Sequence, residues 1–456
     1  MTPIVIKTGE RSIVPYELPT TASRQLHEAI ESLCGKETYQ QYACGKSSDQ
    51  NDPPALRIQA KKQGEKVGLI VETSDFVGFS WVIPGLLGVR VDPKLNDETR
   101  RIDTLCMLRN ALLERVNLEH LYGLVEIKFN TPPLADMKDS EGLGLFLAAM
   151  YLSLLEKIAH KGLRMQFYVK EEVFSRKIKG KIIFSPTVAS RRTPRLSHRL
   201  HCRYQEFSVD SLENRILKCA LRVLMRFLQQ SIHLQKESEE LFKKACPLLR
   251  AFELVSDVSV NVNEIGQISR SMNPVFRDHS VALGLAEKIL RMESIGWNDT
   301  SKKGAIPEHW IYMPKLFELY VYSKLRASLP PDTVIHYQFE RRWQYLDFLC
   351  CLKHNMTPPA PPRFFIADAK YKPRYAKGNS GMVNDLRQLS GYARISGVLD
   401  EFQRQGWENR NLILPCLIIY SDQNLESEEL DWARLKPILG WEAFFKIGLR
   451  LPERKD

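Results

Sequence analysis

A short apolar run near the C-terminus constrains the fold of this chain more than any other feature. It reads Arg-Phe-Phe-Ile-Ala-Asp-Ala-Lys-Tyr-Lys over residues 363–372, and its aromatic and aliphatic residues are typical of a buried β-strand. Asp368 and Lys370 stand near its end with one residue between them. Because side chains alternate along a strand, both project to the same face, about 7 Å apart along the chain. A carboxylate and an ammonium group therefore share one site.

The chemistry of this pair suits the hydrolysis of a phosphodiester. An aspartate is a ligand for Mg²⁺, and a lysine orients or helps deprotonate the attacking water and offsets charge on the phosphate. An Asp-x-Lys tripeptide also occurs by chance about once in a chain of this length, usually as a solvated surface pair. The surrounding sequence therefore decides between a metal-dependent nuclease site and a surface ion pair.

A second acidic ligand has two candidates. Asp347 lies inside the apolar run 345–350, where a carboxylate is costly unless it is paired or binds a metal. If the two runs are antiparallel neighbours, the Asp347 carboxylate reaches Asp368. Asp332 instead follows a proline beyond the end of a predicted helix, where a turn role is the ordinary explanation. We favour Asp347, so that Asp347 and Asp368 are the predicted metal ligands, and Asp332 stays the alternative.

Two predicted helices add polar side chains. Gln388 and Tyr392 are four residues apart in the predicted helix 383–396, so they lie on one helix face. A glutamine there holds the lysine or a phosphate, and a tyrosine stacks or hydrogen-bonds beside it, although an ordinary amphipathic helix shows the same spacing. Glu318 stands among apolar residues in the predicted helix 314–325. It adds a third carboxylate to the site, or it is an exposed helix charge.

The order of elements in the last third of the chain matches a known nuclease fold. The predicted elements are a helix, three strands, a helix and a strand, at 314–325, 334–339, 345–350, 364–371, 383–396 and 412–420. This order and the Asp-x-Lys strand resemble the PD-(D/E)xK nucleases, and the Gln-x-x-x-Tyr helix is similar to that of their RecB-like members. The chain departs from the consensus at Leu346, which stands where the family has proline, and in a long linker at 356–362.

This resemblance defines the predicted active site and its cofactor. The cofactor is Mg²⁺, with Mn²⁺ as the alternative, and the ligands are the two aspartates favoured above. The lysine positions the attacking water, and the other three side chains assist. The predicted catalytic residues are Asp347, Asp368, Lys370, Glu318, Gln388 and Tyr392.

The patterns along the chain predict a multi-domain α+β protein with three parts. Residues 1–95 contain short strand patterns and loops and form a strand-rich module. Residues 96–300 are mainly helical, because leucines recur at three- and four-residue steps. Residues 301–456 form the α/β nuclease core.

Residues 164–205 of the middle part are strongly basic and are interleaved with aromatic residues. Basic density with aromatics is what a nucleic-acid backbone groove requires. A solvated basic loop, or a surface that meets an acidic protein partner, has the same composition. The predicted DNA-contacting residues are Arg176, Lys177, Lys179, Lys181, Arg191, Arg192 and Arg195.

Composition and the apolar runs indicate a cytoplasmic protein. The nine cysteines include no Cys-x-x-Cys pair, which predicts reduced thiols and no zinc site. The longest apolar run, at 143–155, is shorter than the roughly 20 residues that a membrane-spanning helix needs, and the N-terminus has no signal-peptide pattern. The net charge of +11 favours a polyanionic partner, and the nuclease resemblance implies that this partner is double-stranded DNA.

Several pieces of sequence, taken in order, resemble the McrC-like subunits of McrBC modification-dependent restriction systems. They are Val-Asp-Pro-Lys at 91–94, Lys-Gly-Lys-Ile at 179–182, Glu-Asn-Arg-Ile-Leu-Lys at 213–218, Leu-Phe-Glu-Leu-Tyr-Val at 316–321, Asp-Ala-Lys-Tyr-Lys at 368–372, Gln-Leu-Ser-Gly-Tyr-Ala at 388–393 and the closing strand towards 451–452. The resemblance implies an AAA+ GTPase ring of McrB type as partner. It also implies that the N-terminal half docks on that ring and stimulates its nucleotide hydrolysis, with the strand-rich residues 1–95 as the docking module, and that the C-terminal domain cuts DNA.

The same resemblance assigns recognition of the modified cytosine to the partner. The absence of a Gly-x-x-x-x-Gly-Lys-Ser/Thr nucleotide loop from the sequence agrees with this division. Two other hypotheses stay open. The chain is a non-catalytic activator or scaffold of the AAA+ ring with a relic nuclease fold, or it is a standalone RecB-like repair nuclease.

Overall fold

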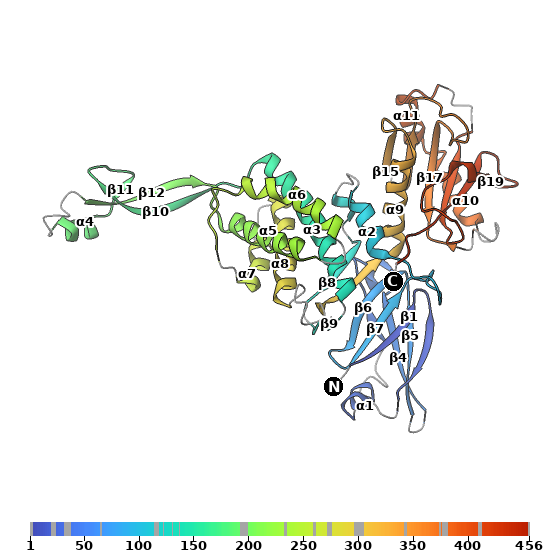
Figure 1. Cartoon of the computed structure of the whole chain (residues 1–456), viewed down its shortest axis with the longest axis horizontal. Coiled ribbons are helices and arrows are strands. Elements are labelled where there is room, and N and C mark those ends of the chain that lie inside the picture. The colour runs from blue at the N-terminus through green and yellow to red at the C-terminus, as the bar shows by residue number, and fades with distance from the viewer. Residues whose placement is uncertain are drawn as a thin grey trace. The chain divides into compact units, whose positions relative to one another are not determined.

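The chain folds into two compact units (Figure 1), which are residues Met1–Leu134 with Pro307–Asp456, and residues Ala135–Ile306. The structure, a computed structural model, describes residues 3–454 except 20–23, 32–37, 64–65, 114–117, 122, 130, 136, 192–198, 232–234, 259–260, 271–275, 296–304, 342–343, 374, 376–381 and 409–412. Helices and several separate sheets make this a mixed α and β protein. The predicted multi-domain α+β class is therefore confirmed as far as the mixture of helices and sheets and the division into two units are concerned.

The N-terminal part of the first unit consists of two sheets. One has the order β1 (Ile4–Gly9), β7 (Leu87–Asp92), β6 (Phe76–Ile83), β14 (Glu308–Tyr312), β8 (Val125–Lys128). The other has the order β2 (Ile13–Glu17), β5 (Lys66–Thr73), β4 (Leu56–Gln63), β3 (Tyr39–Gln41). Strand residues such as Ile58, Val71 and Val89 share one core with Leu26 and Ile30 of helix α1 (Arg24–Glu31).

Strand β14 links this part to the C-terminal part of the sequence, and the sequence patterns did not predict it. It pairs with β6 and β8, and Trp310 at its centre is 1% exposed in the N-terminal core. Gly78 of β6 has φ +143°, and a Cβ there would lie 2.1 Å from the His309 carbonyl oxygen. Only glycine admits so close an approach. Helix α9 (Met313–Ser328), which carries Glu318, therefore begins directly at the end of an N-terminal sheet strand.

The C-terminal part contains a six-stranded sheet. Its order is β15 (Val334–Arg341), β16 (Gln344–Cys351), β17 (Phe364–Lys370), β18 (Cys416–Ser421), β20 (Phe444–Leu449), β19 (Lys436–Pro437). The first three strands are antiparallel, and β17, β18 and β20 are parallel. Helices α9 and α10 (Val383–Tyr392) pack against β17. Side chains from α10 and α11 (Ser396–Arg404) complete one core with the sheet.

Residues 96–134, which the sequence patterns assign to a helical middle part, are included in the first unit. Helix α2 (Thr104–Leu113) packs against α9. The backbone N–H of Asp103 donates to the Pro452 carbonyl at 2.8 Å. The compact units therefore do not follow the three predicted ranges, because contacts between distant parts of the sequence decide them.

The second unit is a helical body around one apolar helix. Its helices are α3 (Met137–Lys161), α5 (Leu212–Gln230), α6 (Gln235–Ala251), α7 (Val262–Arg270) and α8 (Arg277–Ser294), and short strands β9 (Leu134–Ala135) and β13 (Ala305–Ile306) pair at its boundary. The stretch Gly142–Lys161 is long and apolar enough to cross a membrane by length and composition alone, but 78% of it is buried inside the protein. This burial is that of a core helix.

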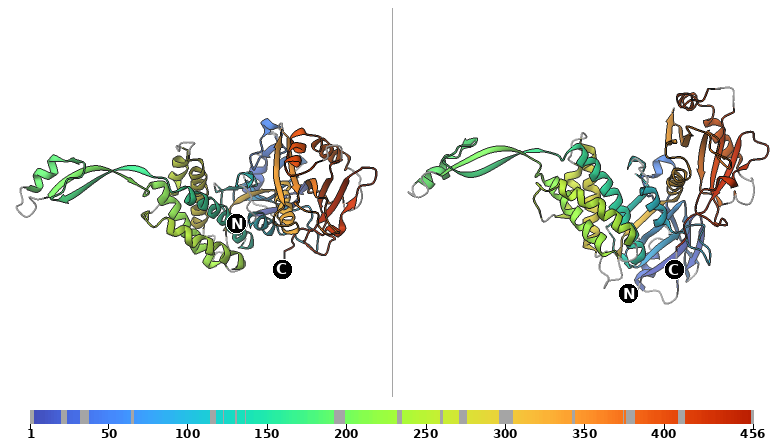
Figure 2. Two further views of the ribbon diagram at one scale, coloured as in Figure 1. Left: turned by 90° about the horizontal axis from the view of Figure 1, so that it is seen from above. Right: turned by 45° about the horizontal axis from the view of Figure 1, so that its top comes forward.

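The same unit carries an antiparallel ribbon where the sequence patterns predict mainly helix. Strand β10 (Gln166–Ser175) pairs along its whole length with β12 (Arg199–Ser208), and the short β11 (Lys181–Ile182) pairs with β12. Helix α4 (Phe184–Arg191) lies near the tip. Figures 1 and 2 show the ribbon extending away from the helices of its unit.

Candidate active site

Strand β17 places a buried carboxylate and a partly buried ammonium group together. Asp368 is 2% exposed, and Lys370 Nζ lies 2.8 Å from Asp368 Oδ2. The side chain of Lys370 is 16% exposed. The pair is therefore not a solvated surface pair, because a buried carboxylate is kept only where it is paired or has a function.

Asp347 joins this pair through the pairing of β16 with β17. The two strands are antiparallel with Phe348 opposite Ala367, so the next positions on the two strands are Asp347 and Asp368. Asp347 Oδ2 accepts a hydrogen bond from the Ala369 backbone N–H at 2.8 Å. Asp332, the alternative acid, lies in a turn with its side chain 47% exposed, 3.8 Å from Lys353 Nζ.

Glu318 adds a carboxylate from α9. The Gln338 amide donates to Glu318 Oε2 at 3.1 Å, and the Tyr337 hydroxyl donates to the same oxygen at 3.4 Å. Both donors lie in β15, which the sequence patterns treated only as a strand. A positive φ of 50° at Gln338 is the local signal that this strand departs from regular geometry.

The three carboxyl groups and Lys370 influence one another. Burial raises the pKa of Asp347 well above its usual range, and the charges of Glu318 and Asp368 raise it further. Burial also raises the pKa of Glu318 and of Asp368, although Lys370 lowers both. Burial lowers the pKa of Lys370, but the carboxylates around it outweigh burial and the pKa is raised. The site therefore brings three carboxyl groups close together and places the Lys370 ammonium group beside them.

Gln388 and Tyr392 extend the site along α10. Lys370 Nζ donates to Gln388 Oε1 at 3.4 Å, and the Gln388 amide donates to the Tyr392 hydroxyl at 2.8 Å. Contacts therefore join Asp368, Lys370, Gln388 and Tyr392. Asp347 lies beside Asp368 in the strand register, and the charge of Glu318 acts on Asp347, so all six predicted catalytic residues belong to one site.

Asp385 belongs to this group and was not singled out from the sequence. It is 7% exposed in the first turn of α10, and its carboxylate lies 2.8 Å from Lys372 Nζ and 4.0 Å from Lys370 Nζ. Asp385, Gln388 and Tyr392 are spaced three and four residues apart, so the helical spacing was the available signal.

The donor set suits a divalent hard cation. Mg²⁺ takes oxygen ligands and is often held by one or two carboxylates together with waters and substrate phosphates. The register of β16 and β17 sets Asp347 beside Asp368. Burial raises the pKa of both carboxyl groups, and a bound cation would lower both pKa values. In the part of the chain that the structure describes, no three His, Cys, Asp or Glu side chains are grouped to hold a metal ion. The fit is therefore to a two-carboxylate site.

The predicted DNA-contacting residues lie in the second unit. Arg176, Lys177, Lys179 and Lys181 are exposed on the ribbon, and the Lys179 ammonium lies 3.8 Å from the centroid of the Tyr204 ring. Arg191 ends α4, and Arg192 and Arg195 fall outside the described residues. Large apolar side chains are exposed on the same ribbon, among them Phe167 and Phe207, and Phe184 is exposed at the start of α4.

Comparison with known proteins places the chain in a family. Two similar solved structures come from Thermococcus gammatolerans. One is a half-complex of McrB AAA+ hexamers with bound McrC, at 16% identity and TM-score 0.40 over 98% of this chain and 94% of that chain. The other is the McrBC complex, at 14% identity and TM-score 0.31 over 71% of this chain and 87% of that chain.

No curated protein matches the chain at a significant level. The sequence profile of the family described as McrBC 5-methylcytosine restriction system component matches residues 71–401. This range includes the Val-Asp-Pro-Lys piece, both aspartates of the candidate site, Lys370 and helix α10. Because the matched range is well over half of the sequence, the chain belongs to the McrBC 5-methylcytosine restriction system component family.

Proposed function

We propose that the chain is the Mg²⁺-dependent DNA endonuclease subunit of a modification-dependent restriction system, with a nuclease core of the PD-(D/E)xK type. The observation that carries the proposal is the register of β16 and β17, which sets Asp347 beside Asp368. The Lys370 ammonium group forms an ion pair with the Asp368 carboxylate. A mixed sheet with this acid pair and an adjacent lysine supports phosphodiester hydrolysis better than any other chemistry of the site.

Each side chain has a role that follows from its contacts. Asp347 and Asp368 would hold Mg²⁺, which supplies Lewis-acid activation of the phosphate when bound. Lys370 orients the attacking water and offsets charge on the phosphate. Gln388 fixes the Lys370 ammonium through its side-chain oxygen, and Tyr392 fixes Gln388 in turn. Glu318, held by Gln338, adds negative charge at the edge of the site.

The partner we propose is an AAA+ ring of McrB type, acting on double-stranded DNA in the cytoplasm. Both similar structures are complexes of McrB and McrC, and family membership supports the same pairing here. The exposed basic and aromatic side chains of the ribbon supply a surface for either polyanionic DNA or a protein partner.

Cleavage assays on the complex with its partner ring test the nuclease proposal. Asp368→Asn and Lys370→Ala are expected to lower the cleavage rate by roughly 10²- to 10³-fold. Asp368→Asn removes the charge of a proposed Mg²⁺ ligand, and Lys370→Ala removes the ammonium group that offsets charge on the phosphate. Stimulation of partner GTP hydrolysis should stay unchanged. Asp332→Asn is the matched control and should cut normally. Undiminished cutting by the Lys370→Ala protein contradicts the assignment.

A relic nuclease fold that only activates the ring is the second candidate. It is favoured by Leu346 in place of the consensus proline and by the long linker at 356–362. Titration with Mn²⁺ separates the two functions. Binding that is lost in Asp347→Asn and Asp368→Asn supports the nuclease, and binding that is absent or independent of both supports the activator. Cleavage of unmodified DNA by the isolated chain would instead indicate a standalone repair nuclease.

A further inference from the structure

A group of charged side chains from the N-terminal sheets reaches the strand that carries Lys370. Glu10 follows β1, Lys94 follows β7, and Asp75 precedes β6. Lys94 Nζ lies 3.8 Å from Glu10 Oε2 and 3.9 Å from Asp75 Oδ1. The side chain of Glu10 is fully buried at 0% exposure, and that of Lys94 is 18% exposed. Lys94 is the last residue of the Val-Asp-Pro-Lys piece at 91–94. None of these four residues belongs to the candidate nuclease site.

This group holds Tyr371, the residue that follows Lys370. The Tyr371 hydroxyl donates to Glu10 Oε1 at 3.3 Å, and Lys94 Nζ lies over the Tyr371 ring, 3.8 Å from its centroid. The Tyr371 ring also packs against Phe317, with ring centroids 5.8 Å apart. Tyr371 is 5% exposed. Its position therefore depends on two side chains that come from a different sheet.

The contacts on Tyr371 bear directly on the candidate site. Consecutive side chains of an extended chain point to opposite sides, so fixing Tyr371 fixes the backbone from which Lys370 projects the other way. Phe317 immediately precedes Glu318 in α9, so the same ring also contacts the neighbour of a second site residue. The N-terminal sheets thus support the site from behind.

Charges at this place are costly for the fold. Burial raises the pKa of Glu10 to about 8 and lowers the pKa of Lys94, although each partner opposes the effect of burial on the other. Apolar side chains of the same size would pack here without that cost. A cation over an aromatic face and a hydroxyl bonded to a carboxyl group both depend on orientation. The arrangement therefore fixes one position of Tyr371.

We propose that Lys94, together with Glu10, is a positioning residue for the nuclease site, and that it sets the place of the Lys370 ammonium beside Asp368 by holding Tyr371. The proposal rests on the proposed nuclease function, and it assigns the Val-Asp-Pro-Lys piece a role at the active site. Lys94 does not touch the reacting atoms, so it acts through Tyr371 and β17 alone.

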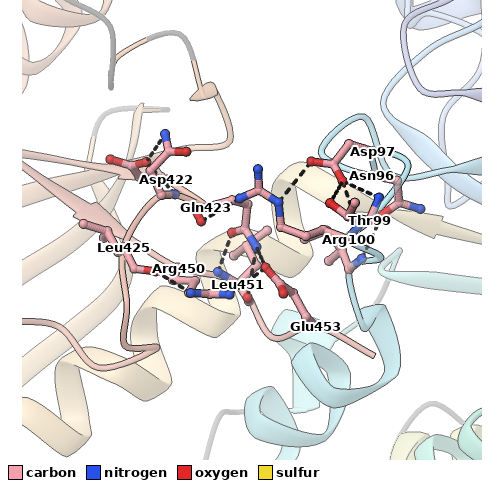
Figure 3. A network of polar contacts seen from close by, with 12 residues as sticks. Asn96, Asp97, Thr99, Arg100, Asp422, Gln423, Leu425, Arg450, Leu451 and Glu453 are labelled. Atoms are coloured by element: carbon pink, nitrogen blue, oxygen red, sulfur yellow. Dashed lines mark hydrogen bonds and ion pairs between the residues drawn. The ribbon is translucent and has the colours of Figure 1, made fainter. Parts of the chain in front are cut away.

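The segment after Lys94 binds the same sheet a second time. Figure 3 shows the network in which Arg100 Nη1 donates to the Gln423 carbonyl at 3.0 Å. Gln423 in turn exchanges hydrogen bonds with the Leu451 backbone, at 2.7 Å and 3.2 Å. Gln423 follows β18 and Leu451 follows β20. Residues 94–103 therefore contact the segments that follow β17, β18 and β20. These contacts fix the backbone that carries Lys94.

Substitutions in the full chain test the proposal. Lys94→Met keeps the length of the side chain and removes its charge, and Lys94→Arg keeps a cation over the Tyr371 ring. Arg57→Met is the matched control, because Arg57 forms a 3.1 Å ion pair with Glu72 on β4 and β5 of the same N-terminal part. The measurements are amide hydrogen exchange of residues 366–372 and the kinetics of Mg²⁺-dependent cleavage by the complex with its partner ring.

Lys94→Met is expected to lower kcat roughly 10- to 100-fold while KM stays within about twofold, the pattern of lost support for a group that acts in the transition state. Amides 366–372 should exchange at least about 10-fold faster because their strand end is released. The melting temperature should match that of Arg57→Met, and Lys94→Arg should restore both kcat and protection.

The proposal is overturned if amides 366–372 exchange at the wild-type rate in Lys94→Met. It is also overturned if the changes in exchange and in kcat are no larger than those of Arg57→Met. If the wild-type complex cuts no DNA, the proposed function fails, and the exchange measurement still decides whether Lys94 positions β17. If Lys94→Met does not fold, Tyr371→Phe removes only the hydroxyl bonded to Glu10. It should show the same loss of protection, and full protection in that variant counts against the role of Glu10.

Discussion

At the scale of single residues, the candidate site depends on one register that local sequence patterns do not contain. The sequence places Asp368 and Lys370 on one face of a strand, because strand alternation needs only neighbouring residues. The position of Asp347 depends on how β16 pairs with β17. A short hairpin turn would have set that register, but residues 352–363 separate the two strands. The sequence therefore leaves Asp347 and Asp332 as alternatives for the second acid. The pairing of Phe348 with Ala367 sets Asp347 beside Asp368.

The contacts of Glu318 and Asp385 were also beyond the sequence patterns. Gln338 reaches Glu318 from a neighbouring strand, and Asp385 contacts Lys372, which lies 13 residues earlier in the sequence. Both contacts join side chains that are more than ten residues apart, so no local periodicity reports them. The chemistry of the side chains was predictable, and their partners were not.

Glu10 leads to a prediction about pH. Burial raises its pKa from 4.5 to about 8, so between these values the folded chain binds a proton that the unfolded chain has released. Stability from this group is fully present below about pH 4.5 and is lost as the pH rises towards 8, at about 1.4 kcal/mol for each pH unit. Glu10→Gln removes this dependence.

Denaturant unfolding at several pH values between 5 and 8.5 measures the effect of Glu10. The free energy of unfolding of Glu10→Gln minus that of the wild type should increase with pH across this range. Glu72→Gln, in the more exposed pair with Arg57, is the control against which the pH dependence of Glu10→Gln is compared. A constant difference for Glu10→Gln would show that Glu10 has an ordinary pKa.

At the scale of elements, apolar periodicity predicted the elements that bury a face. The strands around the site fall close to their expected ranges, and helices α3, α5, α6 and α8 lie in the part of the chain predicted to be mainly helical. Strand β14 was missed because its five residues gain their partners from β6 and β8, far away in the sequence. The β10–β12 ribbon was missed because most side chains of β10 are exposed and few side chains of β12 are buried, so no strong apolar alternation marks it.

The start of α5 shows what local sequence predicts well. The Ser211 hydroxyl accepts a hydrogen bond from the Asn214 backbone N–H at 3.1 Å, and Ser211 is fully buried. Ser211→Ala leaves that N–H without its cap and should destabilise the chain by about 1 kcal/mol. Thermal unfolding measures the loss. Ser211→Thr keeps the acceptor oxygen and should recover most of it, and equal losses in both variants would indicate steric damage instead of a lost cap.

At the scale of the whole molecule, the first compact unit is assembled from two separate stretches of sequence. Residues 1–134 and 307–456 share one unit, and residues 135–306 form the other. Composition along the chain cannot report this, because both outer stretches have ordinary strand patterns. The linkage is visible only in pairings such as Glu308 with Lys128 and Tyr371 with Glu10. It follows that the candidate nuclease core is not separable from the N-terminal sheets.

The first unit should fold without the second when its two stretches stay joined. Lys128 of β8 and Glu308 of β14 are directly opposite in one antiparallel pair, so a short Gly-Ser linker in place of residues 135–306 spans neighbouring strands at a small entropic cost. The shortened chain should unfold in one cooperative transition and bind Mn²⁺ as tightly as the full chain, since both aspartates and the Lys94–Tyr371 contact are retained. A C-terminal fragment of residues 307–456 lacks β6, β8 and Lys94, and we expect it to be insoluble or to bind Mn²⁺ weakly. Full-strength binding by that fragment would show that the site needs no support from the N-terminal sheets.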